Sequence, residues 1–442
     1  MLREKDTVTD LPRSVTNMYI NTTGLVCSLA VLAYALVTPS IEPVTALIAV
    51  CLGLAAPIVV LEMIFLKSHK NPSTGLDFSL PHKNWQLSIV ATKLVGFLAT
   101  LGFVGSFYWS FPEYQGDYYD RYYQFIWLIM PTWLALTVPY FFIVTRYMQD
   151  PKDGYWHFGR LVLFQWQDID FEVLKQHLLG WVVKLFFLPL MFIYLLDKIT
   201  VYQGAEFSEI FISFQTFFDF TFSFLFYIDL LFVTVGYLCT VRLFDAHIRT
   251  TEYSFLGWSV TLACYQPIWS QLSRFYLDYD PGTPWGYWLW DISWLYALWG
   301  TAILLLIAIY VWATLPFGIR FSNLTNRGVV TNGPYRYTKH PAYISKNLSW
   351  WMISMPFLTT GHFSEVIRLS GLLLLLNFIY FMRARTEERH LSLDPTYQSY
   401  AAYIENKGAF RYLGRILPVL KFKQGQLFNT KLTGIPEWET GT

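Results

Sequence analysis

A short stretch near the carboxyl end of the sequence combines residue types that can bind a small charged molecule. Arg383, Glu387 and Leu391 are spaced by four residues, which aligns them on one face of a helix. Glu388 would point about 140° away from Arg383 around that helix, so Glu387 is the better partner for a shared ligand. The concentration of charge at the end of an apolar helix favours a binding site. A plain salt bridge within the helix is the alternative.

A second polar cluster lies in the sequence NGPYRYTKHPAY, residues 332–343. Gly333-Pro334 is a turn signal, and Pro341 restricts the preceding His340 to extended geometry. We therefore expect His340 to be the last residue before a helix that begins at Pro341. The free N–H groups at a helix N-terminus bind anions, which suits a carboxylate. The alternative is a loop that only caps a helical hairpin.

An apolar hairpin separates these two polar clusters. About 43 residues lie between His340 and Arg383, and one bilayer crossing takes roughly 20 helical residues. The interval is therefore long enough to cross the membrane and return once. We expect both clusters to reach the same membrane face and to form one site there.

The composition of the whole chain predicts a membrane protein. Of its 442 residues, 54% are hydrophobic and 14% are charged, whereas soluble domains carry about 25% charged residues. The net charge of +1 and the lack of a basic tail argue against nucleic acid as a partner. The four cysteines lie in apolar runs without metal-binding spacing, so the sequence predicts no metal centre.

About ten apolar runs are candidates for membrane crossings, which predicts an all-α, multi-pass helical membrane protein. The expected spans are residues 18–37, 44–66, 85–111, 123–144, 177–196, 218–241, 255–272, 292–315, 343–360 and 363–381. The seventh and ninth of these runs give the weakest signals. The first 17 residues mix both signs of charge, so the first run is expected to be a retained helix rather than a cleaved leader.

Lysine and arginine are concentrated in alternate loops, and this bias predicts the orientation of the chain. The alternation holds along the whole chain only if the seventh span is counted. It then places the basic residues of 320–339 on the cytoplasmic side, together with both termini. The predicted site would therefore be in contact with cytosolic metabolites.

Charged residues also lie inside the predicted spans. They are Glu62, Lys93, Lys184, Asp219 and Asp229. Charges inside a membrane are functional candidates, which leaves a transport role open. Glu62 and Lys93 lie on consecutive predicted helices, however, and simple pairing between them is the alternative.

The loop at 245–254 is the best candidate for a boundary between two regions. Residues 1–250 would form an N-terminal transmembrane region whose role the sequence does not indicate. Residues 251–442 would form a C-terminal catalytic region in the membrane. No internal repeat or long linker divides the chain elsewhere.

The combined motifs resemble those of a known family. GPYRYTKHPAY is followed by R-x-x-x-E-E-x-x-L, by several tyrosines and by R-x-L-P at 415–418. This pattern resembles the isoprenylcysteine carboxyl methyltransferase family, whose general form is shared by phospholipid N-methyltransferases. The resemblance covers about residues 286–420. It implies a membrane methyltransferase that binds S-adenosylmethionine on the cytosolic side without a Rossmann domain, in keeping with the lack of a G-x-G-x-x-G motif after a strand.

The resemblance also implies which residues contact the cofactor and the acceptor. The implied cofactor contacts are Arg327, Gly328, Val329, Val330, Tyr335, His340, Pro341, Ala342, Tyr343 and Glu387. Arg383 matches the arginine that faces the methyl acceptor, which makes it the implied catalytic and substrate-binding residue. The sequence departs from the family pattern at Lys339, where arginine is usual, at Ser345, where glycine is common, and at 394–400, which replaces a phenylalanine-glycine pair.

The chemistry of methyl transfer fits these residue types. A carboxylate is ionised at neutral pH, so it needs no general base before it attacks a sulfonium methyl group. An arginine can hold the carboxylate at two points and orient one oxygen towards the methyl group, at about 3–3.5 Å. We therefore predict an enzyme that methylates the carboxylate of a lipophilic acceptor, which enters from the bilayer between helices near the hairpin.

Three other interpretations remain open from the sequence alone. An amine acceptor, as in phospholipid N-methylation, would need to lose a proton, and Glu388 or His390 could then take part. A membrane reductase of the sterol-reductase type would use NADPH in place of S-adenosylmethionine. A transporter or lipid-binding scaffold would have no enzymatic role, although intact Arg383, Glu387 and His340 argue against a decayed site.

Overall fold

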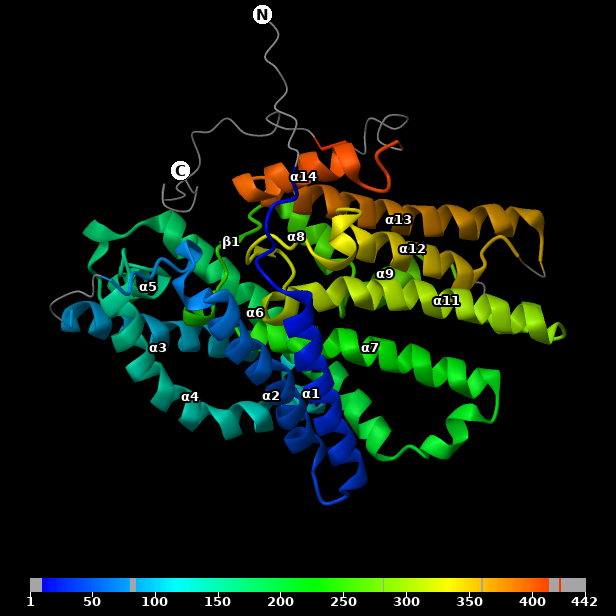
Figure 1. Cartoon of the computed structure of the whole chain (residues 1–442), viewed down its shortest axis with the longest axis horizontal. Coiled ribbons are helices and arrows are strands. Elements are labelled where there is room, and N and C mark those ends of the chain that lie inside the picture. The colour runs from blue at the N-terminus through cyan, green and yellow to red at the C-terminus, as the bar shows by residue number, and fades with distance from the viewer. Residues whose placement is uncertain (1–9, 80–84, 281, 359–360, 413–420, 423–442) are drawn as a thin grey trace, which may run out of the picture.

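The computed structural model is almost entirely helical, in agreement with the predicted all-α class (Figure 1). It describes residues 10–79, 85–280, 282–358, 361–412 and 421–422. The R-x-L-P motif at 415–418 and the end of the predicted ninth span at position 360 lie outside these described residues. Strand is present in one two-stranded antiparallel ribbon of β1 (Thr250–Thr251) and β2 (Thr325–Asn326).

The helices follow the apolar runs of the sequence. They are α1 (Met18–Val37), α2 (Pro43–Leu61), α3 (Leu87–Ser110), α4 (Asp120–Tyr147), α5 (Gly154–Val162), α6 (Phe171–Gln203), α7 (Phe214–Leu238), α8 (Phe255–Leu262), α9 (Ile268–Phe275), α10 (Trp285–Leu289), α11 (Ser293–Thr314), α12 (Pro341–Ser354), α13 (Phe363–Leu391) and α14 (Pro395–Lys407). Short helical turns relevant to the site are η1 (Glu62–Leu66), η9 (Leu315–Arg320) and η10 (Gly333–Arg336).

Polar side chains fix the beginnings of several helices. The side chains of Asn17, Asp170 and Asp394 accept hydrogen bonds from backbone N–H groups in the first turns of α1, α6 and α14. Ser213 and Thr216 form a reciprocal capping box at the start of α7. Each such cap satisfies N–H groups that the helix itself leaves free, and stabilises the helix by about 1 kcal/mol.

In the described part of the chain, eight helices are long and apolar enough to cross a membrane, fewer than the ten predicted. The predicted seventh span, 255–272, is instead divided into α8 and α9 by a turn that contains Pro267. Proline lacks the N–H that a continuous helix needs. In the described part of the predicted ninth span, 343–358, the helix is α12, which has 14 residues from Pro341 and ends where Met355 adopts a left-handed conformation.

The two shorter segments still take the chain away from one end of the helix bundle and bring it back. Thr250 pairs with Asn326, so the chain returns to that end after α8 to α11. His340 Nε2 lies 3.0 Å from Glu388 Oε1, so α12 and α13 together also return there. The two polar clusters therefore meet, as the length of the interval between them predicted. Which membrane face they occupy stays a prediction.

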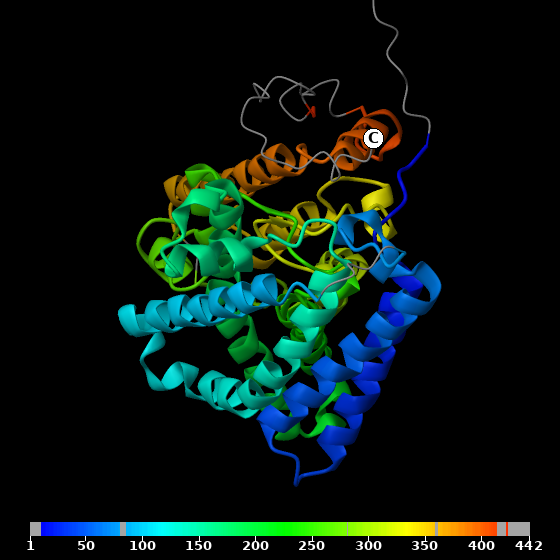
Figure 2. The same ribbon diagram turned by 90° about the vertical axis from the view of Figure 1, so that its left-hand side faces the viewer.

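The helices are arranged around a central meeting point. α7, α11, α12 and α13 lie side by side in one half of the molecule, and α3, α4 and α5 lie in the other half (Figure 1). α1 packs along α2. The view turned by 90° shows this pair along one side of the remaining helices (Figure 2). The largest apolar core joins α2, α6 and α7 through Leu47, Leu195 and Leu231, which are fully buried.

Candidate active site

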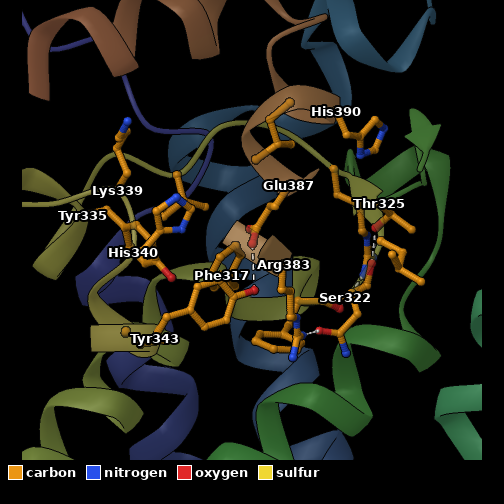
Figure 3. Close-up of a pocket in the computed structure, with 18 of the residues that line it drawn as sticks. Phe317, Ser322, Thr325, Tyr335, Lys339, His340, Tyr343, Arg383, Glu387 and His390 are labelled. Carbon is orange, nitrogen blue, oxygen red and sulfur yellow. Dashed lines mark hydrogen bonds between the residues drawn. The ribbon is translucent and has the colours of Figure 1, made fainter. Parts of the chain in front are cut away.

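A cavity lies where the start of α12, the end of α13 and the segment after α11 meet (Figure 3). The space that the centre of a water molecule can occupy inside it is about 160 Å³. A single water needs roughly 10–15 Å³ of such space, so the cavity can hold a much larger ligand. Ten of the eleven residues singled out from the sequence line this cavity. The exception is Pro341, which is buried in the first turn of α12.

Arg383 and Glu387 both face the cavity from one side of α13, as their spacing predicted (Figure 3). Glu387 Oε2 accepts a hydrogen bond of 2.7 Å from the Tyr343 hydroxyl. Arg383 Nη2 donates to Asn323 Oδ1 at 2.6 Å and to the Tyr265 hydroxyl at 3.4 Å. Within the described residues no ion pair joins Arg383 to Glu387. The alternative of a plain salt bridge within the helix is therefore wrong.

The neighbouring Glu388 is on a different side of the helix and has a different task. Its carboxylate lies 2.7 Å from Lys339 Nζ, 3.0 Å from His340 Nε2 and 2.6 Å from Arg385 Nη1. Glu388 does not line the cavity, so it is not placed to remove a proton from an acceptor there. Lys339 and His340 thus fix the turn before α12 onto α13, while Arg385 is a partner from α13 itself. Lys339, in place of the usual arginine, keeps a positive charge beside Glu388.

α12 begins at Pro341 and His340 precedes it, as the sequence predicted. The His340 and Tyr343 rings lie almost parallel, with centroids 5.5 Å apart. Because Tyr343 bonds Glu387 and His340 bonds Glu388, the first turn of α12 is held against α13 at two points. Pro341 has no N–H and Ile344 N donates to His340 O at 3.2 Å, so the N–H groups of Ala342 and Tyr343 are the ones in this turn without a partner within the helix.

Tyr335 lines the cavity from η10, on the same side as Lys339 and His340 (Figure 3). Burial raises the pKa of its phenol well above the usual value, and the negative charge of Glu387 adds to the shift. Tyr335 is therefore neutral at physiological pH, and it can take part in binding only as a hydrogen-bonding and apolar group.

Arg327 has a structural task that the sequence did not indicate. Its side chain is 3% exposed. The guanidinium donates to backbone carbonyl groups of Gly236, Cys239, Ala246, Ile319 and Phe321. Arg327 therefore ties the end of α7, the loop before β1 and the end of η9 together. It contributes to the wall of the cavity without a free guanidinium.

The segment 328–332 is covered by the N-terminal segment of the chain, which the sequence did not predict. Val15 N donates to Val329 O at 3.1 Å, and Thr331 Oγ1 donates to Pro12 O at 2.8 Å. Gly328 has a φ of +107°, and a Cβ atom there would lie 2.9 Å from the Val15 side chain. A glycine is required at this position for both reasons.

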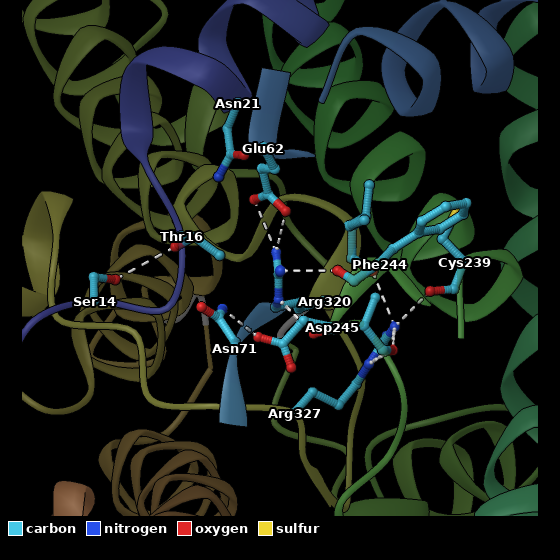
Figure 4. Close-up of polar contacts among 12 residues, drawn as sticks. Ser14, Thr16, Asn21, Glu62, Asn71, Cys239, Phe244, Asp245, Arg320 and Arg327 are labelled. Atoms are coloured by element: carbon cyan, nitrogen blue, oxygen red, sulfur yellow. Dashed lines mark hydrogen bonds and ion pairs between the residues drawn. The ribbon is translucent and has the colours of Figure 1, made fainter. Parts of the chain in front are cut away.

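A buried ion pair links the N-terminal region to the cavity (Figure 4). Arg320 Nη1 lies 2.8 and 2.7 Å from the two oxygens of Glu62, and both side chains are 1% exposed. Arg320 also lines the cavity and donates to Asp245 O at 2.9 Å. The suggested pairing of Glu62 with Lys93 is wrong, because Lys93 Nζ instead lies 2.9 Å from Asp153.

Several further cavity residues gave no signal in the sequence. They are Tyr265, Asn323 and Lys346, of which the first two hold Arg383. Tyr265 precedes the stretch that resembles the family, and Asn323 lies between its motifs. Their partnership with Arg383 follows from the path of α8 and of the segment after α11, which local spacing does not reveal.

Some charged side chains that line the cavity have an oppositely charged partner, and others have none. Arg320 pairs with Glu62, Lys339 pairs with Glu388 and Glu405, Glu252 pairs with Arg389, and Arg327 is saturated by carbonyl groups. Among the described residues, Arg383, Lys346 and Glu387 line the cavity without an oppositely charged side chain at ion-pair distance. The cavity thus offers one free carboxylate and two free cations to ligands.

Comparison with known proteins gives one match. Searches of curated proteins and of solved structures found no match to the chain. A scan against protein families matched a single stretch that runs from the first turn of α11 to just beyond α13, and all eleven residues singled out from the sequence fall within it. The C-terminal residues 295–393 of this multi-pass helical chain therefore match the model of the isoprenylcysteine carboxyl methyltransferase (ICMT) family.

Proposed function

We propose that this protein is an integral-membrane methyltransferase that uses S-adenosylmethionine and methylates the carboxylate of a lipophilic acceptor. The observation that carries the proposal is the set of unpaired charges in one cavity. Glu387 is complementary to a cationic ligand, and Arg383 is complementary to an anionic one. They lie one helical turn apart on α13, so the two ligands would meet.

The residues at the Glu387 end of the cavity fit S-adenosylmethionine. The Glu387 carboxylate can accept from the ammonium group of the methionine part, and the free N–H groups at the start of α12 can donate to its carboxylate. The backbone of Gly328 to Val330 and the Tyr335 ring provide close, uncharged walls. When bound, S-adenosylmethionine supplies a methyl group on a positively charged sulfur, which a carboxylate oxygen can take directly.

Arg383 is prepared to hold the acceptor. Asn323 and Tyr265 accept from one of its nitrogens, and the Tyr343 ring centroid lies 5.3 Å from its guanidinium carbon. These contacts restrict the side chain to one orientation and leave other N–H groups for a carboxylate. A carboxylate held in this way needs orientation and no proton removal. Of the two groups that an amine acceptor could use as a base, Glu388 does not line the cavity, whereas His390 does, with its Nε2 2.9 Å from Thr250 Oγ1.

The surroundings of the cavity support an acceptor that arrives from the lipid. Leu348 on α12 and Leu374 and Phe378 on α13 are all more than 50% exposed, at 51%, 58% and 55%. Exposed apolar side chains on long apolar helices are typical of lipid contact. α13 is long and apolar enough to cross a membrane, and its exposed apolar residues, with Leu348 of α12, support a route from the lipid to the site.

The first test is cofactor binding by purified protein in detergent. We expect S-adenosylmethionine to raise the melting temperature and NADPH to leave it unchanged. In calorimetry, Glu387→Gln should weaken S-adenosylmethionine binding about 10- to 100-fold, because a hydrogen bond to a charged group contributes roughly 1.5–3 kcal/mol. Glu172→Gln, at an exposed glutamate on α6, is the control and should bind as the wild type does.

Two results would contradict the cofactor assignment. Stabilisation by NADPH alone would favour a reductase of the sterol-reductase type. Equal S-adenosylmethionine affinity in wild type and Glu387→Gln would remove Glu387 from the binding site, even if the cofactor itself binds.

A further inference from the structure

Two cations face the same aromatic wall at one end of the cavity. Lys346 is on α12, and Arg383 and Tyr380 are on α13. The Tyr380 ring centroid is 5.9 Å from Lys346 Nζ and 5.9 Å from the Arg383 guanidinium carbon. Both side chains line the cavity. Lys346 belongs to neither motif used to recognise the site, and the sequence alone gave it no role.

Lys346 is surrounded by rings rather than by acids. Its Nζ lies 5.1 Å from the Tyr310 ring centroid and 5.4 Å from that of Trp350. Asp229, which does not line the cavity, already accepts hydrogen bonds from Tyr310 at 2.7 Å and Thr314 at 2.5 Å. No carboxylate of the described chain lies within ion-pair distance of Lys346.

Two unpaired cations in a space with aromatic walls repel each other and are poorly solvated. Aromatic faces attract each cation only weakly and offset this repulsion only in part. An anionic ligand between them would remove the repulsion and satisfy both. An ammonium group in the same place would add a third positive charge, which is unfavourable.

We propose that Lys346 is a specificity-determining residue that, together with Arg383, forms a two-cation site for an anionic acceptor head group. This site selects a carboxylate acceptor and excludes an amine one. The proposal rests on the function proposed above and adds the residue that gives the site its preference for a carboxylate over an amine. It also gives the rings of Tyr310, Trp350 and Tyr380 a role as the apolar wall around the part of the acceptor next to its head group.

The test uses two probes that share an isoprenoid thioether and carry head groups of opposite charge. N-acetyl-S-farnesylcysteine carries a free carboxylate, and S-farnesylcysteamine carries an amine on a similar isoprenoid thioether. Binding of each probe to the full-length protein is measured by displacement in the presence of S-adenosylhomocysteine, which prevents turnover. Methyl transfer to each probe is measured separately with S-adenosylmethionine.

We expect the wild type to bind the carboxylate probe more tightly than the amine probe. Lys346→Met should weaken binding of the carboxylate probe about 10- to 100-fold and raise its KM to match, because one charge-assisted contact is lost. The affinity for S-adenosylmethionine should stay within a few-fold, which also shows that the variant is folded. Lys346→Arg should retain the preference for the carboxylate probe.

Lys184→Met is the matched control. Lys184 is also a lysine within a membrane helix, with its Nζ 3.5 Å from the Trp181 ring centroid and 3.0 Å from Thr240 Oγ1, but it does not line the cavity. This variant should bind both probes as the wild type does.

Three outcomes would overturn the proposal. Lys346→Met could bind the carboxylate probe as tightly as the wild type, it could lose affinity for S-adenosylmethionine instead, or the wild type could prefer the amine probe. If carboxylate binding depends on Lys346 but neither probe is methylated by any variant, the two-cation site stands and the proposed methyl transfer is wrong.

Discussion

Two adjacent glutamates near the end of α13 have different surroundings, and this difference determines what each can do. Glu387 faces the cavity with one tyrosine as its partner. Glu388 faces away from the cavity and binds Lys339, His340 and Arg385. A rotation of about 100° per residue along the helix is enough to separate a ligand-binding carboxylate from a structural one. The same geometry places Arg383 beside Glu387 and not beside Glu388.

The first prediction at this scale concerns Arg383. Arg383→Lys keeps the positive charge and removes the planar group that can hold a carboxylate at two points. We expect S-adenosylmethionine affinity to stay within a few-fold, while kcat for methyl transfer falls by roughly two orders of magnitude, since misplacement of a reacting group has effects of that size. Calorimetry and single-turnover kinetics separate the two quantities.

Arg121→Lys is the control, because Arg121 is exposed on α4, outside the cavity. If Arg383→Lys lost cofactor binding and turnover together, Arg383 would belong to the cofactor pocket. If it lost neither, the assignment of Arg383 to a carboxylate acceptor would be wrong.

The elements around the cavity are connected by a buried ion pair that hydropathy does not reveal. Glu62 in η1 and Arg320 in η9 are both 1% exposed and are joined by two contacts of 2.8 and 2.7 Å. Removal of one partner of such a pair leaves a buried charge without compensation, which costs about 3–5 kcal/mol. Glu62→Gln should therefore lower the free energy of unfolding by about this amount.

The exposed pair of Arg160 and Asp168 provides the comparison, with side chains 22% and 57% exposed. Asp168→Asn should cost at most about 1 kcal/mol, because solvent screens this pair. Denaturation midpoints in the same detergent, followed by tryptophan fluorescence, measure both variants. Equal small losses would show that Glu62 does not anchor Arg320 in the folded protein.

Some of these elements could be predicted from the sequence, and others could not. The eight long helices were predictable, because each is an apolar run of sufficient length. The start of α12 was predictable from Pro341, and the shared face of Arg383 and Glu387 from their spacing. The division of 255–272 into α8 and α9 and the partner of Glu62 were not predicted correctly. Both depend on which distant segments pack together, and hydropathy reports only how apolar a segment is.

At the scale of the whole molecule, the N-terminal region is part of the construction of the site. Residues 12–16 cover the segment that begins at Gly328, and Glu62 holds Arg320 in the cavity wall. β1 pairs with β2 across the predicted boundary near residue 250. The division into two regions stays a prediction, and contacts of this kind give the first region a structural role beside the matched residues 295–393.

The proposed reaction is the transfer of a methyl group from S-adenosylmethionine to a carboxylate. The most direct measurement incubates the protein in lipid nanodiscs with methyl-tritiated S-adenosylmethionine and N-acetyl-S-farnesylcysteine, then treats the extracted lipids with alkali. A methyl ester is cleaved by alkali and releases its label as volatile methanol, whereas an N-methyl group keeps it. We predict volatile label with the wild type and about 100-fold less with Arg383→Lys. Label that resists alkali, on an amine lipid, would contradict the account.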